Sequence, residues 1–329
     1  MATKPILLHY YITNRCNARC RFCTIWSENP KKDATLRDVT KNLTISKSAG
    51  CKFVDFTGGE PLLHPDLPQF LTIAQKKGFI TSVTTNCILF PERVKELKGK
   101  IDLLHFSLDA DTESLHNEIR GCNSYVKVLE SIEAARCHDL VPDILFTYTD
   151  YNIDAFEGVY ALARKKRLTV ILDPVFRLQG CDTVAVSTHE KALRFARKPG
   201  IYLNRAHLTL RNMGGNHIRE PYCRAVTSTI VISPDNKRLL PCFHHHCETV
   251  PADESMTNAI TPVLAKALAK QGTYSFCEGC HINCYFDPSY NYRYNRLFFQ
   301  SLKSKLVYIS MKYLIYGHFK AFLRLKRAL

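Results

Sequence analysis

The amino-acid sequence predicts an α/β fold built around a parallel sheet. Short apolar runs, rich in β-branched and aromatic residues, alternate six times with helical patterns over residues 6–172. Such alternation is typical of parallel strands joined by crossover helices. After residue 200 the alternation fades and clustered cysteines follow. The chain therefore divides into a large α/β region and a smaller cysteine-bearing region.

The predicted elements follow one another closely along the first region. Residues 6–12 form the first strand, and a helix over residues 35–49 ends at Gly50, the residue type that most often terminates helices. The other predicted strands are 52–56, 79–85, 102–108, 143–148 and 168–172, and the other predicted helices are 66–77, 91–97, 124–138 and 153–166.

Length and composition restrict the class of protein. With 329 residues, 46% of them hydrophobic, the chain can bury one large core or two modest ones. Fourteen cysteines in a chain this long, without a visible secretion signal, indicate metal binding in a reducing compartment. No apolar stretch reaches 18 residues, so no membrane-spanning helix is predicted. We therefore expect a cytoplasmic protein.

Three cysteines follow the first strand with the spacing C-x3-C-x2-C: Cys16, Cys20 and Cys23. Iron–sulfur clusters normally take four thiolates. Three from one loop would leave one iron with an open position, as catalytic metal sites require. A structural zinc site with a fourth ligand such as His9 is the alternative. Zinc loops usually pair two C-x2-C knuckles or add histidines at helical spacing, so the cluster is favoured.

These cysteines, together with Thr57-Gly58-Gly59-Glu60-Pro61 about 35 residues later, resemble the radical S-adenosylmethionine (SAM) enzymes. The resemblance covers about residues 6–180 and implies a partial (β/α)6 TIM-like barrel. It also implies that Cys16, Cys20 and Cys23 hold a [4Fe-4S] cluster. The amino and carboxylate groups of the methionine part of SAM would then chelate the fourth iron.

The resemblance further implies a reaction. An external donor such as flavodoxin or ferredoxin supplies one electron, the cluster cleaves SAM, and the 5'-deoxyadenosyl radical abstracts a substrate hydrogen. The enzyme would be an oxidoreductase or a transferase, and its substrate is not indicated. A peptide- or RNA-modifying radical SAM enzyme is one alternative. A non-catalytic zinc or iron–sulfur binding protein is the alternative from another class.

Polar motifs also follow the next three strands. Gly58-Gly59-Glu60 follows the second strand, Asn86 the third, and Ser107 and Asp109 the fourth. In parallel barrels the chemistry lies at the carboxyl ends of the strands, so we expect these residues to share one site with the cysteines. A zinc knuckle would explain the cysteines but not the other motifs.

Each motif has a functional and a purely structural interpretation. The glycine pair permits positive φ and close backbone approach, and Pro61 restricts Glu60 to an extended conformation. By resemblance, Gly58, Gly59 and Glu60 contact the methionine ammonium of SAM; the alternative is an ordinary tight turn. Asn86, Ser107 and Asp109 resemble the polar contacts to the ribose and carboxylate of SAM, although Asn after a strand is more often a turn residue.

Ile119-Arg120-Gly121 is a further pattern frequent in the family. Arg120 would pair with the carboxylate of SAM, and a solvated arginine at a helix end is the alternative. Residues 148–153 lack the glycine-rich pattern that the family often shows near the fifth strand. The resemblance therefore assigns no adenine contact there.

A second set of cysteines lies in the later region. Cys223 precedes, and Cys242 follows, a β-hairpin predicted from residues 229–232 and 238–240. Cys277 and Cys280 form a C-x2-C knuckle, so the two pairs could close one four-coordinate site. On spacing alone, zinc and an iron–sulfur cluster are equally compatible with this site.

The arrangement resembles the SPASM or shortened Twitch extension of radical SAM enzymes. It implies that Cys223, Cys242, Cys277 and Cys280 hold an auxiliary [4Fe-4S] cluster, which would accept an electron or orient the substrate. Cys284 is an alternative to Cys280. The run His244-His245-His246 is either another source of ligands or a polar loop.

Residues 290–329 carry nine Lys or Arg residues and no acidic residue. The spacing predicts a basic amphipathic helix. Its apolar face would be Leu302, Leu306, Ile309, Tyr313 and Tyr316, with Lys303, Lys305, Lys312 and Lys320 between them. Two interpretations remain: an anchor on an anionic membrane surface, which would favour a lipid-linked substrate, or a core-packing helix whose lysines face water. Binding to nucleic acid is disfavoured, because the apolar stripe of this helix is broader than a surface that follows a phosphate backbone needs.

The sequence thus predicts three parts. Residues 1–200 form the partial barrel, residues 201–289 the auxiliary-cluster module, and residues 290–329 the basic C-terminal helix.

Overall fold

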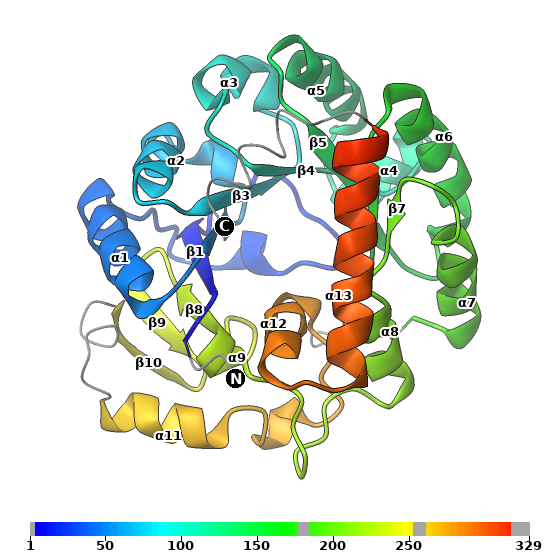
Figure 1. Ribbon diagram of the computed structural model, residues 1–329. Coiled ribbons are helices and arrows are strands. Elements are labelled where there is room, and N and C mark those ends of the chain that lie inside the picture. Colours follow the sequence, from blue (N-terminus) through cyan, green and yellow to red (C-terminus); the bar gives the residue numbers. More distant parts are fainter. Residues whose placement is uncertain (1–3, 177–183, 253–260, 317–329) are drawn as a thin grey trace.

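The computed structural model describes residues 4–176, 184–252 and 261–316, and one ten-stranded sheet lies at its centre (Figure 1). The strand order is β10-β9-β8-β1-β2-β3-β4-β5-β6-β7. Neighbours from β1 to β7 pair in parallel. These strands are β1 (Leu7–Thr13), β2 (Phe53–Gly58), β3 (Ile80–Thr85), β4 (Leu103–Ser107), β5 (Pro142–Tyr148), β6 (Val170–Pro174) and β7 (Ile201–Tyr202).

Helices cover the outer side of this sheet, as expected for a partial barrel (Figure 1). The six predicted strands and five predicted helices are confirmed within a few residues. The helices are α1 (Leu36–Ala49), α2 (Leu67–Lys76), α3 (Phe90–Leu97), α4 (Glu113–Arg120), α5 (Tyr125–Cys137), α6 (Phe156–Lys166), α7 (Val186–Phe195) and α8 (Arg205–Asn212). The sequence patterns did not indicate α4, whose residues are mostly polar.

The predicted hairpin after residue 228 extends the barrel sheet instead of forming a separate one. β8 (Thr229–Ile232) pairs in parallel with β1, and β9 (Lys237–Leu240) and β10 (Glu248–Pro251) follow antiparallel. The later region also contains α9 (Ala225–Ser228), α11 (Pro262–Lys270) and α12 (Asn283–Ser289). The predicted division at residue 200 stays a prediction, but the two regions share one sheet.

The two faces of the parallel strands differ in chemistry. On β1, Leu8, Tyr10 and Ile12 belong to the apolar core beneath the helices, and His9 points to the other face. The inner face carries paired polar side chains, because His9 lies 3.7 Å from Asp55 and His105 lies 3.7 Å from Asp143. Barrel interiors are usually filled by branched apolar residues. This interior instead carries paired polar side chains on at least four strands.

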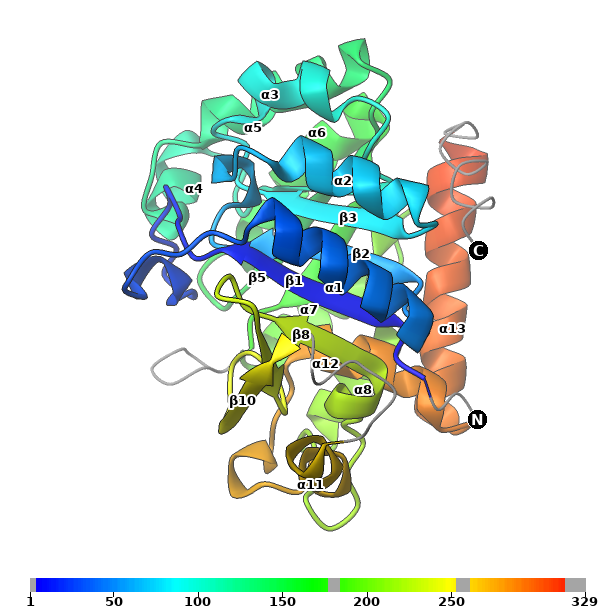
Figure 2. The same ribbon diagram turned by 90° about the vertical axis from the view of Figure 1, so that its left-hand side faces the viewer.

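The C-terminal helix α13 (Arg296–Ile309) and the π-helical turn Ser310–Ile315 cover the amino-terminal end of the barrel. Figure 2 shows α13 at one end of the barrel and the loop after β1 at the opposite end. Tyr313 packs on Ile80 at the start of β3. Lys312 Nζ lies 2.6 Å from Asp143 Oδ2, and both side chains are buried. Breaking such a pair typically costs about 3–5 kcal/mol, so it holds this helix against the barrel.

The predicted apolar stripe of this helix is wrong in part. Tyr313 and Tyr316 are buried, but Leu302 and Leu306 are 42% and 57% exposed, and Lys312 faces the barrel instead of water. The helix approaches α8 through small serines, and the π-helical turn changes the phase of the side chains that follow. Lys320 lies outside the described residues. Across those described residues, no helix is both long and apolar enough to cross a membrane.

Candidate functional site

The loop after β1, which carries Cys16, Cys20 and Cys23, is closed at its base by polar contacts. Thr13 Oγ1 donates to Asp33 Oδ1 at 2.6 Å, and the Arg15 guanidinium lies 2.7 Å from Asp33 Oδ2. The Asn14 and Lys32 backbones join beside them, with 3.2 Å between Asn14 N and Lys32 O. These contacts pinch residues 14–32 into a loop that projects from the carboxyl end of the strand.

The glycine pair after β2 lies directly against this loop. Gly59 N donates to Thr13 O at 2.9 Å, and Glu60 N donates to Arg15 O at 2.8 Å. A Cβ atom at Gly58 would lie 2.0 Å from Thr13 O, and one at Gly59 would lie 2.1 Å from Arg15 O. Only glycine therefore permits this backbone pairing. The pair joins β2 to the cysteine loop, which an ordinary tight turn would not do.

Glu60 ties the end of β2 to the end of β3. Its buried carboxylate accepts hydrogen bonds from Leu62 N, Thr85 Oγ1 and Asn86 N at 2.8–3.0 Å. Burial raises the pKa of Glu60, and these donors act in the opposite direction. Asn86 Nδ2 in turn donates to Asn17 Oδ1 in the cysteine loop at 2.7 Å. The predicted contacts of Glu60 and Asn86 with SAM stay predictions.

The end of α4 holds the other side of the cysteine loop. Arg19 N donates to Arg120 O, and Arg21 N donates to Ile119 O, both at 3.0 Å. Gly121 has φ +61°, and a Cβ atom there would lie 2.5 Å from Arg19 O. Ile119-Arg120-Gly121 thus forms a second backbone clamp on the loop. Its glycine both ends the helix and permits the close approach.

The Arg120 side chain points into the site. It is 7% exposed, so the interpretation as a solvated arginine is wrong. Its Nε lies 2.6 Å from Asp109 Oδ2, and its Nη1 donates to Cys20 Sγ at 3.6 Å. Its Nη2 is buried with no hydrogen-bond partner among the residues that the structure describes. The guanidinium therefore keeps one donor available beside the cysteines.

Asp109 and Ser107 lie at the end of β4, on the same side as Arg120. Asp109 is fully buried and accepts from Thr147 N at 2.8 Å. Burial raises the pKa of Asp109, and the Arg120 charge lowers it. Ser107, the last residue of β4, is also buried. Asp109 thus orients Arg120, and the predicted contacts of both residues with SAM are not tested by this geometry.

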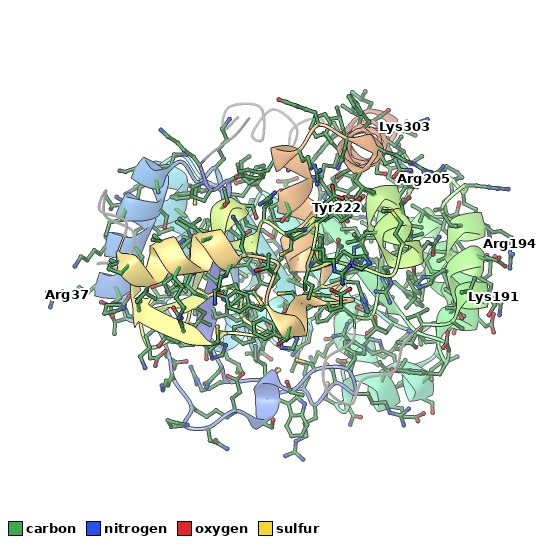
Figure 3. All side chains as sticks on the ribbon, turned by 90° about the horizontal axis from the view of Figure 1, so that it is seen from below. Arg37, Lys191, Arg194, Arg205, Tyr222 and Lys303 are labelled. Carbon is green, nitrogen blue, oxygen red and sulfur yellow. The ribbon has the colours of Figure 1, made fainter. Side chains whose placement is uncertain are left out.

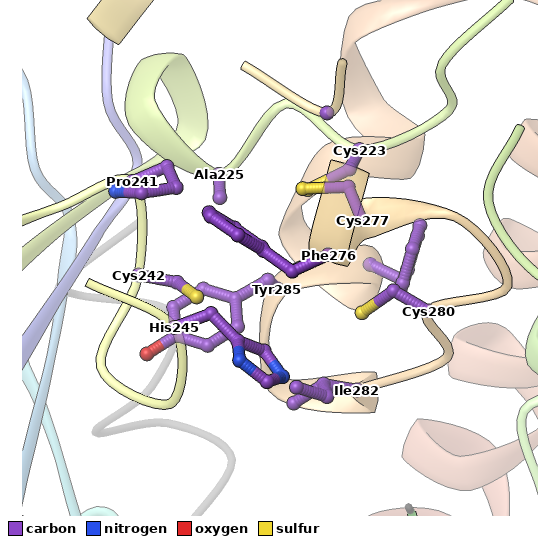
Figure 4. Close-up of a pocket in the computed structure, with 12 residues that line it drawn as sticks. Cys223, Ala225, Pro241, Cys242, His245, Phe276, Cys277, Cys280, Ile282 and Tyr285 are labelled. Carbon is purple, nitrogen blue, oxygen red and sulfur yellow. The ribbon is translucent and has the colours of Figure 1, made fainter. Parts of the chain in front are cut away.

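The second set of cysteines lines one cavity. Cys223, Cys242, Cys277 and Cys280 surround it together with apolar residues and His245 (Figure 4). Burial raises the pKa of Cys242 to about 12 and of Cys277 to about 11, and the neighbouring thiols act in the same direction. The four sulfurs predicted as ligands are therefore close enough to interact. Cys284 does not line this cavity, but it packs against the same apolar cluster as Cys223, Cys242 and Cys280.

An aromatic layer formed by Tyr11 and Phe243 packs in one cluster with cysteines of both sets. Tyr11 stacks on Phe243, with 3.8 Å between ring centroids and 6° between ring planes. The same apolar cluster includes Cys23 from the first set and Cys242 from the second. Both sets therefore border one continuous packed region on the β1–β8 side of the barrel.

A model of the radical SAM superfamily matches residues 10–163, which contain the cysteine loop and both backbone clamps. The chain contains a radical SAM domain. The GTP 3',8-cyclase of Clostridium acetobutylicum is 32% identical over 143 residues, which is 41% of this chain and 44% of that protein. The probable GTP 3',8-cyclase of Sulfolobus acidocaldarius is 33% identical over 138 residues, with the same coverage. The matched region thus spans less than half the length of these relatives.

Solved structures show the likeness of fold over a larger part of the chain. SuiB of Streptococcus suis bound to S-adenosylmethionine superposes with a TM-score of 0.63 at 16% identity, over 81% of this chain and 66% of SuiB. A structure of anSMEcpe with bound AdoMet gives a TM-score of 0.62 at 15% identity, over 96% of this chain and all of that chain. These neighbours confirm the predicted α/β partial-barrel fold.

The residues of the radical SAM domain suit the cofactors that its family implies. Three thiols and a buried guanidinium with an unpaired donor match the charges of an iron–sulfur cluster and of the SAM carboxylate. Burial raises the pKa of Cys16 to about 12, so a thiolate there needs a nearby positive charge such as a metal. No three ligands converge on a single metal ion within the described ranges, so this fit rests on donor chemistry.

Two contacts of the site were not visible in the sequence. Thr85 and Asn17 bind Glu60 and Asn86, respectively, and so connect β2, β3 and the cysteine loop. Both residue types are common in loops and at strand ends, so neither carries a signal by itself. The position of Thr85 at the end of a strand was the only available indication.

We predict that Gly59→Ala lowers the iron bound by the radical SAM domain, because its Cβ atom would displace the Arg15 carbonyl and the cysteine loop. Iron and sulfide are measured after anaerobic reconstitution. Gly99→Ala is the matched control, because no atom lies within 4 Å of its Cβ position and its φ of +74° makes it the more strained backbone. Equal iron contents in both variants would contradict the clamp.

Proposed function

We propose that this protein cleaves SAM reductively and uses the 5'-deoxyadenosyl radical to abstract a hydrogen atom from a polar substrate. The main support for this proposal is the position of the cysteine loop, which is clamped between Gly59 and Gly121. Arg120 Nη2 is buried beside this loop without a hydrogen-bond partner among the described residues. When bound to Cys16, Cys20 and Cys23, a [4Fe-4S] cluster supplies the electron for this cleavage. A one-electron donor such as flavodoxin or ferredoxin recharges it.

The chain contributes orientation and charge. Arg120 offers a donor to the carboxylate of SAM, and Asp109 fixes the guanidinium by an ion pair of 2.6 Å. Glu60 keeps the ends of β2 and β3 together through its bonds to Thr85 and Asn86. The loops that would surround SAM therefore keep their relative positions. Burial of these groups strengthens each interaction, because the local dielectric is low.

The polar inner face of the barrel supports a polar substrate. His9, Asp55, His105 and Asp173 lie on the inner face of the strands, opposite the main apolar core beneath the helices, and share this face with Tyr11. The relatives' name makes GTP one substrate to test, and peptides remain the second class. Identification of the product decides whether the enzyme is an oxidoreductase or a transferase.

We predict dithionite-dependent release of 5'-deoxyadenosine from SAM by the reconstituted protein. Cys23→Ala abolishes the release, because the cluster loses one of its three thiolates. The product is quantified by liquid chromatography under anaerobic conditions. Cys137→Ala, which changes an exposed cysteine on α5, retains wild-type activity. Release that is unchanged in Cys23→Ala, or absent from the wild type, would refute the proposed function.

We further propose that Cys223, Cys242, Cys277 and Cys280 hold an auxiliary [4Fe-4S] cluster. The support is their common cavity, which contains four thiols and no acidic side chain among its lining residues (Figure 4). Cys280 is the fourth ligand in this proposal, because Cys284 lies outside the cavity. The cluster would border the aromatic layer that Tyr11 and Phe243 form.

The iron content distinguishes this proposal from a zinc site. We predict about eight iron atoms and no zinc per reconstituted chain, because each of two clusters contains four irons. Cys280→Ser lowers the iron content to about half, since the auxiliary cluster loses a ligand. Cys284→Ser, a matched change four residues away, leaves it unchanged. Four irons with one zinc would assign the second site to zinc instead.

The exposed face of α13 and the turn after it support a third proposal, peripheral attachment to an anionic membrane. Apolar side chains on this face are 42–63% exposed, and Lys303 and Arg296 lie on the same helix. The exposed apolar residues are Phe299, Leu302 and Leu306 on α13 and Leu314 and Ile315 on the π-helical turn that follows it. Because α13 lies at the end of the barrel opposite the cysteine loop, this attachment does not by itself deliver a lipid-linked substrate to the site (Figure 2).

Sedimentation with liposomes tests this attachment. We predict that the full chain sediments with vesicles that contain anionic lipid and not with purely zwitterionic vesicles, because basic residues accompany the apolar face. Leu302→Glu with Leu306→Glu reduces sedimentation severalfold, since two buried contacts with lipid become charged. Leu36→Glu, at a leucine exposed on α1, is the control. Equal sedimentation of all three proteins would remove the proposal.

A further inference from the structure

A buried group of basic side chains lies beyond the carboxyl end of β6. His207 and Arg211 lie four residues apart on α8, so they share one face of that helix. Arg211 Nη2 donates to Val175 O, immediately after β6, at 3.1 Å. His189 on α7 interacts with the same guanidinium. The group therefore joins the rim of the barrel to the two helices beside it.

His207 and Arg211 keep polar atoms without partners, whereas His189 Nδ1 lies 2.9 Å from the Tyr148 hydroxyl and pairs with it. His207 is 1% exposed, and neither of its ring nitrogens has a hydrogen-bond partner among the described residues. Arg211 Nη1 is buried without a hydrogen-bond partner there. Burial lowers the pKa of Arg211, and the charge of the Asp173 carboxylate acts to raise it without bonding to Nη1. Buried polar groups are nearly always paired, so such a concentration of unpaired donors indicates a ligand.

The ordinary explanation for a helix-end arginine accounts for only part of this. A positive charge in the last turn of α8 is favoured by the helix dipole. The dipole does not explain why Arg211 Nη1 is buried without a partner. It also does not explain why neither ring nitrogen of His207 has a hydrogen-bond partner among the described residues. An oxygen anion between these side chains would satisfy both, because it accepts from the guanidinium and from an imidazole N–H.

Asp173 and Asn283 are polar residues next to this basic group. Asp173, on the inner face of β6, accepts from Asn283 Nδ2 at 2.8 Å, and Asn283 Oδ1 is buried without a partner in the described part of the chain. Asn283 and Cys284 begin α12, three residues after Cys280. The hydrogen bond from Asn283 to Asp173 therefore joins the inner face of β6 to the helix that follows the second cysteine set.

We propose that Arg211 and His207 bind an oxyanion of the substrate, a carboxylate or a phosphate, at the carboxyl end of β6. This inference rests on the proposed function, because it assigns the anion to the substrate of the radical reaction. The remainder of the substrate would extend from there along the polar inner face of the barrel, toward the cysteine loop.

Calorimetric titration of the anaerobically reconstituted full chain tests the site, with inorganic phosphate and acetate as probes and chloride as the reference. We expect saturable binding of phosphate or of acetate, and the stronger probe identifies the class of anion. Arg211→Gln weakens it by about tenfold or more, because the charged donor is lost. Arg205→Gln is the matched control, since Arg205 lies on the same helix with its side chain at the surface (Figure 3).

Further variants keep the test valid if Arg211→Gln fails to fold. Arg211→Lys keeps the charge but not the two-donor geometry, and His207→Gln keeps polar atoms without the ring; each weakens binding by a smaller factor. Equal binding by Arg205→Gln and all Arg211 and His207 variants, or no saturable binding by the wild type, overturns the inference. Release of 5'-deoxyadenosine without anion binding overturns this inference alone. Binding without release refutes the proposed function and, with it, the assignment of the anion to the substrate, and leaves only the anion site.

Discussion

The arrangement of the site depends on two stretches of backbone pairing that only glycine permits. The cysteine loop is bonded on one side to Gly59 and Glu60 and on the other side to residues 119–121. At Gly58, Gly59 and Gly121 a side chain would overlap a carbonyl oxygen of this loop or of β1. Because these bonds join main-chain atoms, they fix the course of the loop independently of the cysteine side chains. The thiols are thus presented by a frame of main-chain hydrogen bonds to which their own side chains do not contribute.

This frame also places the charges. The clamp formed by residues 119–121 carries the Arg120 guanidinium to within 3.6 Å of Cys20, and Asp109 at the end of β4 keeps it oriented. One element therefore both holds the loop and supplies positive charge beside its thiols. Arg211 and His207 place a second basic group at the end of β6. The carboxyl ends of the strands thus bear two separate basic groups around a polar interior.

The opposite end of the barrel is covered by the C-terminal segment. Lys312 from the C-terminal segment forms a buried ion pair with Asp143, and Tyr308 donates to the same carboxylate at 2.6 Å. Tyr313 packs on the first residue of β3. Because α13 lies at the end opposite the cysteine loop, its exposed apolar side chains are far from the candidate site (Figure 2).

The sequence by itself determined the strand–helix alternation, the cysteine spacings and the position of each polar motif at a strand end, because these depend on local pattern and chain order. It also predicted four cysteines around one cavity. Only the tertiary structure decided which face of α13 is buried, since Asp143 and the serine contacts with α8 override the apolar stripe. It likewise showed that Gly58 and Gly59 pair with the loop, and that Arg120 and Arg211 are buried, because side-chain burial and backbone proximity arise between segments far apart in the chain.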